Sequence, residues 1–460
     1  MYLLNQSFLM FGLSKSGKSA TEFLLESGAR VYIYDESASD RIEKTTQLLV
    51  ESGAKRLEKE NLDRAVDECD VLVLSPGIPI DHPLAVSFKR SGKAVVGETE
   101  LAARFMQCTV VAITGTNGKT TTVSMIESVL NQGGITAKAC GNIGTPMIEC
   151  RALDKKDVAV AEISSFQMET LSSLRPHIAA VLNVTEDHLN RHYSMENYVF
   201  LKAKLLKNLT EAEYAILNFD DPIVRGFAQK TKAKIVWFSV RDRVRGAYYE
   251  NGDLYFMDEK ILPANELLAE GVHNIQNALV AIAVGKLMGV KTQDVSSALV
   301  AFKGIKHRIE IVDEVNGVVF VDDSKGTNVD ATIKATMAMK RETVLLLGGK
   351  NKGYDYGKLF SAIKKSKVVH AVLYGENRYE LLKSAREEGF ENFSLCDGFE
   401  FAVRVAALIA KRGQVVLLSP ASASFDEFTS YEERGERFVE IVRSLQENAN
   451  KTTSDCEENE

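Results

Sequence analysis

Three observations predict an α/β fold with three domains. The chain has 460 residues, which is too long for one hydrophobic core, since domains commonly hold about 100–150 residues. Short apolar runs alternate with helical patterns along the chain, as in parallel sheets covered by helices. These runs fall into successive groups, and we place the domains at residues 1–107, 108–302 and 303–446. The polar, acidic residues 447–460 are expected to be disordered.

The first domain is predicted from apolar strands that alternate with helical patterns. QSFLMF, RVYIYD and DVLVLSPG are expected to be buried strands. The first strand runs into GLSKSGKS, Gly12 to Ser19, which fits the phosphate-loop pattern G-x-x-x-x-G-K-[ST] at every position. The second strand ends on Asp35, at about the distance from Gly12 at which a Rossmann-type acid meets a sugar hydroxyl.

The second domain begins with the strand TVVAITG, which leads into another glycine loop and an amphipathic helix. This loop, Gly115 to Thr121, contains a lysine and several hydroxyls, although Ile113 stands where the strict pattern needs its first glycine. Two buried strands follow and end in polar residues. DVAVAEISS carries Glu162, and IAAVLNVTEDH ends on His188.

The third domain repeats the alternation of strand and helix. Ligands in such sheets bind at the carboxyl ends of the strands, where the polar clusters of this chain also lie. Its expected strands are VVFVDDS, ETVLLLGG, VVHAVLYG and QVVLLSPAS, and its last helix is ERGERFVEIVRSLQ.

We expect only one of the two glycine loops to bind a triphosphate. Either could hold phosphate, because backbone N–H groups at a helix N-terminus face an anion. Triphosphate chemistry also needs a metal ion, and therefore hard oxygen ligands nearby. Glu162 and the T-E-D-H segment supply such ligands for the second loop. We therefore predict that the second loop binds ATP and that the first holds a diphosphate that is not cleaved.

Composition excludes several classes of function. The net charge is 56 minus 63, or −7, so no general basic surface for nucleic acid is expected. Six scattered cysteines without C-x-x-C spacing argue against a zinc site or a disulfide framework. No signal peptide and no apolar run of membrane-spanning length is visible. We expect a cytoplasmic protein without a membrane or nucleic-acid partner.

In its glycine loops and in the polar segments that follow its strands, the chain resembles a known family, the Mur ligases, which are ATP-dependent amino-acid ligases of peptidoglycan synthesis. The resemblance runs from about Phe8 to Leu445 and favours the branch that adds D-glutamate to UDP-N-acetylmuramoyl-L-alanine. It implies a Rossmann-like N-terminal domain that binds the UDP substrate, a central P-loop ATPase-like domain and a Rossmann-like C-terminal domain. The motifs that carry it are TGTNGKTTT, GNIGTP, AEISSFQ, NVTEDHLNRH, HNIQNALVA, KHRIE, DDSKGTN and LLLGGKNKG.

The resemblance implies an acyl-phosphate reaction that uses ATP and two Mg²⁺ ions, in a protein that we expect to be a monomer. Lys119 would reach the terminal phosphates, and Thr120, Glu162 and His188 would bind metal. Lys204 aligns with a lysine that is carbamoylated in the family, although Lys202 is close enough to be confused with it. The implied nucleotide contacts are Gly115, Thr116, Asn117, Gly118, Lys119, Thr120, Thr121, Asn277, Arg308 and Asp322.

The resemblance also implies where the other two substrates bind. We expect Asn142 near the reacting carboxylate. Two lysines directed at one pocket suit a dianionic amino acid such as glutamate. Candidates for the UDP end are Ser14, Lys15, Asp35 and Ser75, and candidates for the amino acid are Lys325, Thr327, Lys352, Ser424 and Tyr431.

Some alternatives stay open at the level of sequence. The first domain lacks the basic residue that often follows its acid in the family, so the uridine contacts are unsettled. Lys350 is an additional lysine beside Lys352, and the amino acid accepted could be broader than D-glutamate. Another Mur ligase, a folylpolyglutamate synthase and a phosphate-loop ATPase switch are the competing functions, and the last gives DDSKGTN and GGKNKG no role.

Overall fold

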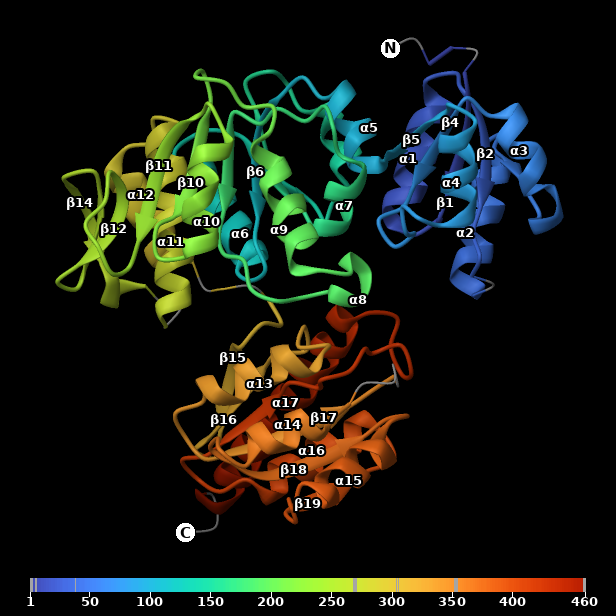
Figure 1. The fold of residues 1–460 in the computed structure, drawn as a ribbon. Coiled ribbons are helices and arrows are strands. Elements are labelled where there is room, and N and C mark those ends of the chain that lie inside the picture. Colours follow the sequence, from blue (N-terminus) through green and yellow to red (C-terminus); the bar gives the residue numbers. More distant parts are fainter. Residues whose placement is uncertain are drawn as a thin grey trace. The chain divides into compact units, whose positions relative to one another are not determined.

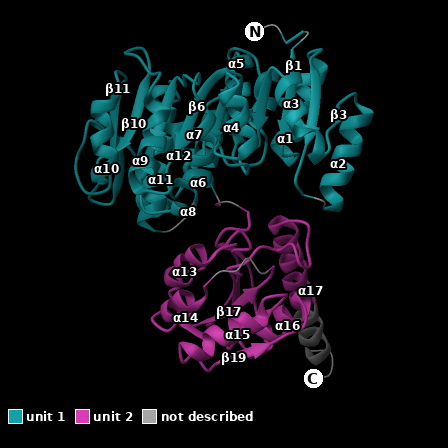
Figure 2. Ribbon diagram, turned by 45° about the vertical axis from the view of Figure 1, so that its right-hand side comes forward, with its two compact units in different colours: residues 1–303 teal, residues 304–460 magenta. Residues whose placement is uncertain are grey.

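The structure is a computed structural model that describes residues 3–4, 6–37, 39–267, 271–302, 304, 306–350 and 355–457. The chain forms two compact units, residues 1–303 and 304–460 (Figure 2). We describe each unit by itself. The first contains two sheets and the second contains one.

The N-terminal sheet is parallel throughout, with the strand order β3-β2-β1-β4-β5. The central strand β1 is buried at every residue, which explains why its sequence is apolar without alternation. Helices cover the sheet (Figure 1). The strands are β1 (Ser7–Phe11), β2 (Arg30–Tyr34), β3 (Lys55–Arg56), β4 (Val71–Leu74) and β5 (Ala94–Gly97); the helices are α1 (Lys15–Glu26), α2 (Asp40–Glu51), α3 (Leu62–Glu68), α4 (Pro83–Arg90) and α5 (Glu98–Phe105).

The second sheet of this unit has nine strands in the order β14-β13-β12-β11-β10-β9-β6-β8-β7. Strand β6 lies between β8 and β9, so the glycine loop that follows it has a carboxyl strand end on either side. The strands are β6 (Thr109–Thr114), β7 (Ala137–Gly141), β8 (Val158–Glu162), β9 (Ile178–Val181), β10 (Tyr214–Asn218), β11 (Lys234–Ser239), β12 (Gly246–Glu250), β13 (Asp253–Phe256) and β14 (Glu259–Pro263).

The helices of this second sheet bury apolar faces against it. Helix α11 is buried continuously from Asn277 to Gly285 and packs on α6 in a shared core. The helices are α6 (Lys119–Gln132), α7 (Ser165–Thr170), α8 (Leu189–His192), α9 (Met195–Ala203), α10 (Pro222–Arg225), α11 (Val272–Leu287) and α12 (Thr292–Ala301).

The second unit has a six-stranded sheet in the order β15-β16-β20-β17-β18-β19, with separate apolar cores formed by alternate residues of its strands. Only the β15–β16 pair is antiparallel. The strands are β15 (Glu310–Val315), β16 (Val318–Asp322), β17 (Thr343–Gly348), β18 (Val368–Tyr374), β19 (Phe393–Leu395) and β20 (Val415–Leu418); the helices are α13 (Val329–Ala338), α14 (Gly357–Ile363), α15 (Arg378–Glu387), α16 (Phe399–Ile409) and α17 (Tyr431–Glu457).

Three antiparallel hairpins, β12–β13, β13–β14 and β15–β16, were not predicted from the sequence. Strands β12 and β13 are joined at Asn251-Gly252, and β15 and β16 at Asn316-Gly317. These four linking residues have positive φ, between 50° and 90°. That conformation is the one that Asn-Gly favours in tight hairpin turns.

The predicted α/β class with three sheets is confirmed. The first two predicted domains share one compact unit, and the division between units, after Lys303, lies beside the predicted boundary at 302/303. The other domain boundaries stay a prediction. Helix α17 continues to Glu457, into the stretch 447–460 for which we expected disorder. Within the described ranges, no helix has both the length and the apolar composition needed to cross a membrane.

Candidate functional site

The second glycine loop has the geometry of a phosphate-binding loop. Helix α6 begins at Lys119, and the preceding Gly118 has a φ of +85°. A Cβ atom on Gly118 would lie 2.5 Å from Asn277 Oδ1, so no other residue fits without displacement. Lys119 Nζ donates to the carbonyl oxygens of Gly115 and Thr116, at 2.9 and 3.0 Å. The lysine charge therefore lies over the loop, where backbone N–H groups at the helix N-terminus already favour an anion.

The end of strand β9 holds this loop in shape. Asn117 N donates to Asn183 Oδ1 at 2.8 Å, and Asn183 Nδ2 donates back to the Asn117 carbonyl at 3.1 Å. Thr116 Oγ1 donates to the Thr185 carbonyl at 3.1 Å. Asn183 was not among the predicted site residues, although it stands in the quoted N-V-T-E-D-H segment. Asn183 and Thr185 also line an open pocket beside the loop.

Oxygen ligands lie together at the ends of strands β7 and β8. Thr120 Oγ1 donates to Glu162 Oε2 at 2.8 Å, and Asn142 Nδ2 donates to Glu162 Oε1 at 3.0 Å. Thr120 and Glu162 are both buried. Thr120 at the start of α6 and Asn142 after β7 thus both donate to the Glu162 carboxylate at the edge of the nucleotide loop. Hydroxyl and carboxylate oxygens are suitable ligands for Mg²⁺.

Lys202 lies beside this loop, and the predicted role of Lys204 stays a prediction. Lys204 Nζ donates to the carbonyl oxygens of Met168 and Glu169, at 2.7 and 3.3 Å. Lys202 is 1% exposed, and its ammonium lies 4.5 Å from the centre of the Tyr198 ring. The hydroxyl of Tyr198 is 3.1 Å from Thr116 Oγ1 of the loop.

The environment of Lys202 favours a neutral amine. Burial lowers the pKa of Lys202 well below its ordinary value, and the charge of Lys119 lowers it further. The sequence carried a usable signal for this residue, because Lys202 follows Tyr198 by four positions and so shares its helix face.

His188 directly precedes helix α8 and has a left-handed conformation, with a φ of +52°. Its ring lies 4.9 Å from the Phe166 ring, and Nε2 is 3.5 Å from Asp187 Oδ2. Half of the side chain is exposed. The imidazole is therefore accessible at the carboxyl end of the sheet, and its role as a metal ligand stays a prediction.

Asn277 is buried under the loop. Its Oδ1 accepts a hydrogen bond from Thr122 Oγ1 at 3.1 Å, and its Nδ2 donates to Asn274 Oδ1 at 3.4 Å. Thr121, like Thr120, lies buried in the first turn of α6. Asn277 thus fixes α11 against the start of α6, and its expected adenine contact stays a prediction.

The first glycine stretch has a different geometry, although it fits the strict pattern. Helix α1 already begins at Lys15, so Gly17 and Lys18 lie within its first turn. A Cβ atom on Gly17 would lie 1.9 Å from the Gly12 carbonyl oxygen, which shows that this glycine allows close packing of helix and strand. Lys18 Nζ points to Glu22, 3.7 Å away. The Gly-Lys-Ser triplet therefore does not form the anion loop that the pattern predicts.

The four residues predicted for the UDP end are brought together around this turn. Asp35 Oδ2 accepts from Leu13 N at 2.6 Å, and Ser14 Oγ is 3.1 Å from Ser75 Oγ. Lys15 Nζ donates to the Gly144 carbonyl at 2.5 Å, in the GNIG segment that also contains Asn142. A second contact between the two sheets of this unit joins Ser19 Oγ to Glu149 Oε1 at 2.8 Å.

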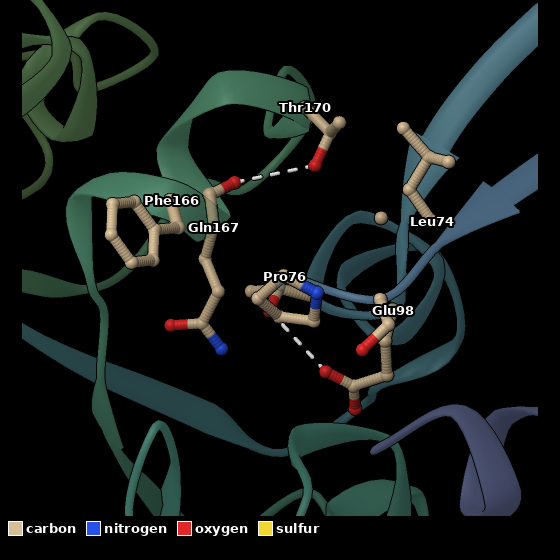
Figure 3. A pocket seen from close by; sticks show the side chains of 9 residues that line it. Leu74, Pro76, Glu98, Phe166, Gln167 and Thr170 are labelled. Atoms are coloured by element: carbon tan, nitrogen blue, oxygen red, sulfur yellow. Dashed lines mark hydrogen bonds between the residues drawn. The ribbon is translucent and has the colours of Figure 1, made fainter. Parts of the chain in front are cut away.

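A small pocket of about 10 Å³, the size of about one water molecule, lies between the two sheets (Figure 3). One wall comes from the end of β4 and the start of α5, and the other comes from α7. Burial raises the pKa of the Glu98 carboxyl in this pocket to about 7. The lining residues are Leu74, Ser75, Pro76, Gly97, Glu98, Thr99, Phe166, Gln167 and Thr170.

In the second unit, Asp322 and Asp323 are buried at the end of β16, and the expected nucleotide contacts of Arg308 and Asp322 stay a prediction. Asp322 is fully buried, and its Oδ2 is 2.7 Å from His307 Nδ1. Burial raises the pKa of Asp323 to about 7, and the guanidinium of Arg308 opposes that shift. Two adjacent aspartates at a strand end point in different directions, and the sequence alone did not separate them.

The residues predicted to hold the amino acid lie on the loops after β16 and β20. The Lys325 ammonium is 5.4 Å from the centre of the Tyr431 ring, and Thr327 N donates to the Lys325 carbonyl at 2.8 Å. Ser424 is buried, and within the described residues its Oγ has no hydrogen-bond partner. Such an orphaned hydroxyl is consistent with a ligand site.

Of the two lysines in GGKNKG, the structure describes Lys350. Lys352 lies outside the described residues. Lys350 Nζ forms an ion pair with Glu376 Oε2 at 2.6 Å, and that hydrogen bond raises the pKa of the lysine. The additional lysine is therefore neutralised by a neighbour on its own unit.

Three domain families of one enzyme class match this chain. Residues 6–97 match the "Mur ligase MurD-like, N-terminal domain", residues 113–285 match the "Mur ligase middle domain", and residues 307–422 match the "Mur ligase, glutamate ligase domain". Together the matched ranges contain most of the residues discussed above from all three sheets; Glu98, Thr99, Ser424 and Tyr431 lie outside them.

Curated relatives match over nearly the full chain. The UDP-N-acetylmuramoylalanine--D-glutamate ligase of Pelotomaculum thermopropionicum is 39% identical over 443 residues, which cover 95% of this chain and 97% of the relative. The enzyme of the same name from Clostridioides difficile is 37% identical over 451 residues, which cover 97% and 100%.

Solved structures share the fold at low identity. The UDP-N-acetylmuramate-alanine ligase MurC of Thermotoga maritima has a TM-score of 0.60 and 17% identity, with 95% of this chain and 99% of that chain covered. The MurF ligase of the same organism, in complex with ADP, has a TM-score of 0.56 and 18% identity, with 97% and 96% covered. At this identity the likeness concerns the fold alone.

Proposed function

This chain belongs to the Mur ligase family, and from that membership we propose that it joins D-glutamate to UDP-N-acetylmuramoyl-L-alanine at the expense of ATP. The observation that carries the proposal is the full-length similarity to relatives that bear this activity in their name. The Lys119, Thr120 and Glu162 arrangement supports the ATP-dependent step, because it places a cation and hard oxygen ligands at one phosphate loop.

The reaction forms an amide from a carboxylate and an amine. The alanyl carboxylate attacks the γ-phosphorus of ATP, which gives an acyl phosphate and ADP. The amine of D-glutamate then attacks the acyl carbon, phosphate leaves, and the ammonium proton is released. Positioning and neutralisation of charge are the demands on the protein. We assign Lys119 to the terminal phosphates and Asn142 to the reacting carboxylate.

Two Mg²⁺ ions fit the residues present. Thr120 and Glu162 form one pair of oxygen ligands, and their contact at 2.8 Å brings the two donors together. His188, accessible at the next strand end, is the candidate for the second ion. Bound there, Mg²⁺ would neutralise charge on the phosphates.

We propose that Lys202, instead of Lys204, carries the carbamate. A neutral amine is the form that adds CO₂, and burial beside Lys119 favours that form at Lys202. The product is an anion, which would face the Lys119 cation and could ligate a metal. Burial also lowers the pKa of Lys204, but its ammonium is held by two backbone carbonyl oxygens, which favour the charged form.

We assign the UDP-linked substrate to the N-terminal domain and the amino acid to the C-terminal domain. Ser14, Lys15, Asp35 and Ser75 surround the turn after β1 and are proposed to hold the UDP end. Lys325 beside Tyr431 and the orphaned hydroxyl of Ser424 are proposed to hold the carboxylates of the amino acid. We propose cytoplasmic action as a monomer, without nucleic acid or membrane partners.

The test is a phosphate-release assay with Mg-ATP, UDP-N-acetylmuramoyl-L-alanine and single amino acids. We expect release that requires both the UDP sugar and D-glutamate, and L-glutamate and meso-diaminopimelate serve as controls. Release with another amino acid would assign a different specificity. Release without any amino acid would contradict the ligase assignment and favour an ATPase switch.

A further inference from the structure

We propose that Arg191 is a positioning residue that ties helix α7 to the loop after β4, where Ser75 lies, across the small pocket in Figure 3, and that it thereby sets the affinity for the UDP-linked substrate. This inference rests on the proposed function, since it takes Ser75 to hold the UDP-linked substrate. Arg191 belongs to helix α8, three residues after His188. None of its contacts is with the nucleotide loop.

Arg191 binds one wall through a two-pronged ion pair. Its Nε donates to Glu169 Oε1 at 2.9 Å, and its Nη2 donates to Glu169 Oε2 at 2.7 Å. The side chains of Arg191 and Glu169 are 15% and 8% exposed. The guanidinium also lies 5.1 Å from the centre of the Phe166 ring. Phe166 and Glu169 both belong to α7, so this contact fixes the helix that forms the wall.

The same guanidinium reaches the other wall. Arg191 Nη2 donates to the Ile78 carbonyl at 2.9 Å, and Nη1 donates to the Gly77 carbonyl at 3.4 Å. Gly77 directly follows Ser75 and Pro76, which line the pocket from the N-terminal sheet. Figure 3 shows Pro76 on this side and Phe166, Gln167 and Thr170 along α7. One side chain thus ties both walls together.

Only an arginine can make this brace. A lysine ammonium could satisfy one carboxylate oxygen, but it lacks the planar fork that serves a carboxylate and two carbonyls at once. Loss of the guanidinium would also leave the buried Glu169 carboxylate without its strongest partner, which is costly.

The brace also links the pocket to the candidate metal ligand. The Phe166 ring contacts both Arg191 and His188. The next residues add to the same junction: the Tyr193 hydroxyl donates to Asp81 Oδ2 of the N-terminal domain, and His192 Nε2 is 2.9 Å from Ser165 Oγ of α7. Displacement of the α8 segment would therefore move the pocket walls and His188 together.

Arg175 offers a matched control. It makes a comparable ion pair in the same unit, with Nε and Nη2 at 3.0 and 2.6 Å from Glu213 Oε1. Its Nη2 also donates to Thr210 Oγ1 at 3.0 Å, and Arg175 does not line the pocket. Arg191→Lys and Arg175→Lys therefore each remove a guanidinium that pairs with a glutamate. Of the two, only Arg191→Lys also removes a contact with the N-terminal domain.

We expect Arg191→Lys to raise the KM for UDP-N-acetylmuramoyl-L-alanine by about tenfold or more, which corresponds to loss of a charge-assisted contact. The KM for ATP should stay within about twofold of that of Arg175→Lys. Amide hydrogen exchange in residues 75–82 should accelerate in Arg191→Lys and not in Arg175→Lys. Thermal unfolding measured on both variants checks that they are folded.

A folded Arg191→Lys protein with an unchanged KM for the UDP sugar would overturn the inference, and so would an equal rise in the KM for all three substrates. The exchange measurement needs no turnover, so it separates this inference from the proposed function. If the native protein failed to use the UDP sugar but exchange still accelerated only in Arg191→Lys, the brace would stand and the assignment of its ligand would fall.

Discussion

A lysine buried beside another lysine has a physical reason to be uncharged, and this applies to Lys202. Its ammonium would face Lys119 with little water to screen the repulsion, whereas Lys204 rests on carbonyl oxygens. Burial lowers the pKa of both lysines, and the charge of Lys119 lowers that of Lys202 further. The side chains point in different directions because successive helix residues are rotated by about 100°.

We predict that Lys202 is the site of carbamoylation. In protein equilibrated with ¹³C-bicarbonate, the carbamate carbon signal should be present in the native chain and in Lys204→Ala, and absent in Lys202→Ala. Turnover should fall together with the signal, because the carbamate supplies the anion at the metal site. Loss of the signal in Lys204→Ala alone would restore the original assignment.

The two glycine stretches give a second prediction at this scale. Lys119→Ala should lower kcat by a factor on the order of 10²–10³, as for removal of one charge-stabilising donor. Lys18→Ala should leave kcat and the KM for ATP nearly unchanged, because Lys18 pairs with Glu22 on an exposed helix face. Steady-state kinetics with varied ATP measures both. Loss of ATP use in Lys18→Ala would reverse our assignment of the loops.

At the scale of the element, the start of α6 combines strain with close packing. Gly118 needs a left-handed backbone and also leaves no room for a Cβ atom beside Asn277. Gly134, at the other end of the same helix, has a similar φ of +77° but open space around it. The pair allows backbone strain to be separated from displacement of Asn277.

We predict that Gly118→Ala lowers the free energy of unfolding by about 1–3 kcal/mol and weakens ATP binding, whereas Gly134→Ala lowers only the stability, by about 1 kcal/mol. Urea denaturation and ATP titration of both variants provide the measurements. Equal ATP affinity in the two variants would show that the contact with Asn277 does not shape the loop.

At the scale of the whole molecule, Glu98 joins the two sheets of the first unit. It begins α5, and its Oε1 accepts a hydrogen bond from Ile148 N at 2.7 Å. Burial raises the pKa of this carboxyl from 4.5 to about 7. The folded state therefore favours the protonated acid, and its stabilising contribution is complete below pH 4.5 and is lost as the pH rises through 7.

We predict that Glu98→Gln is more stable than the native chain above pH 7 and that the difference disappears toward pH 4.5. The shift in pKa sets an upper limit of about 3 kcal/mol for the difference at high pH. Chemical denaturation between pH 4.5 and 8.5 measures it. A difference that is independent of pH would mean that Glu98 titrates normally in the folded protein.

Much of the fold followed from the sequence because its parallel strands are buried on both faces and read as uninterrupted apolar runs, as in β1. The hairpins were missed although Asn251-Gly252 and Asn316-Gly317 are recognisable turn signals, because their flanking strands are short and partly polar. The loop residues of the candidate site were predicted from motifs. Lys202, Asp323 and Arg191 depend on which way a side chain points, and spacing alone does not give that.

Helix α1 begins before the Gly-Lys-Ser triplet, so the glycine that completes the strict pattern is there for steric reasons. A glycine can be needed at such a junction because the helix lies close to its strand. If a lysine and a serine follow that glycine by chance, a genome-wide scan for nucleotide-binding proteins would report a false positive. Scans would become more selective if they also required the helix to start at the lysine, as it does at Lys119.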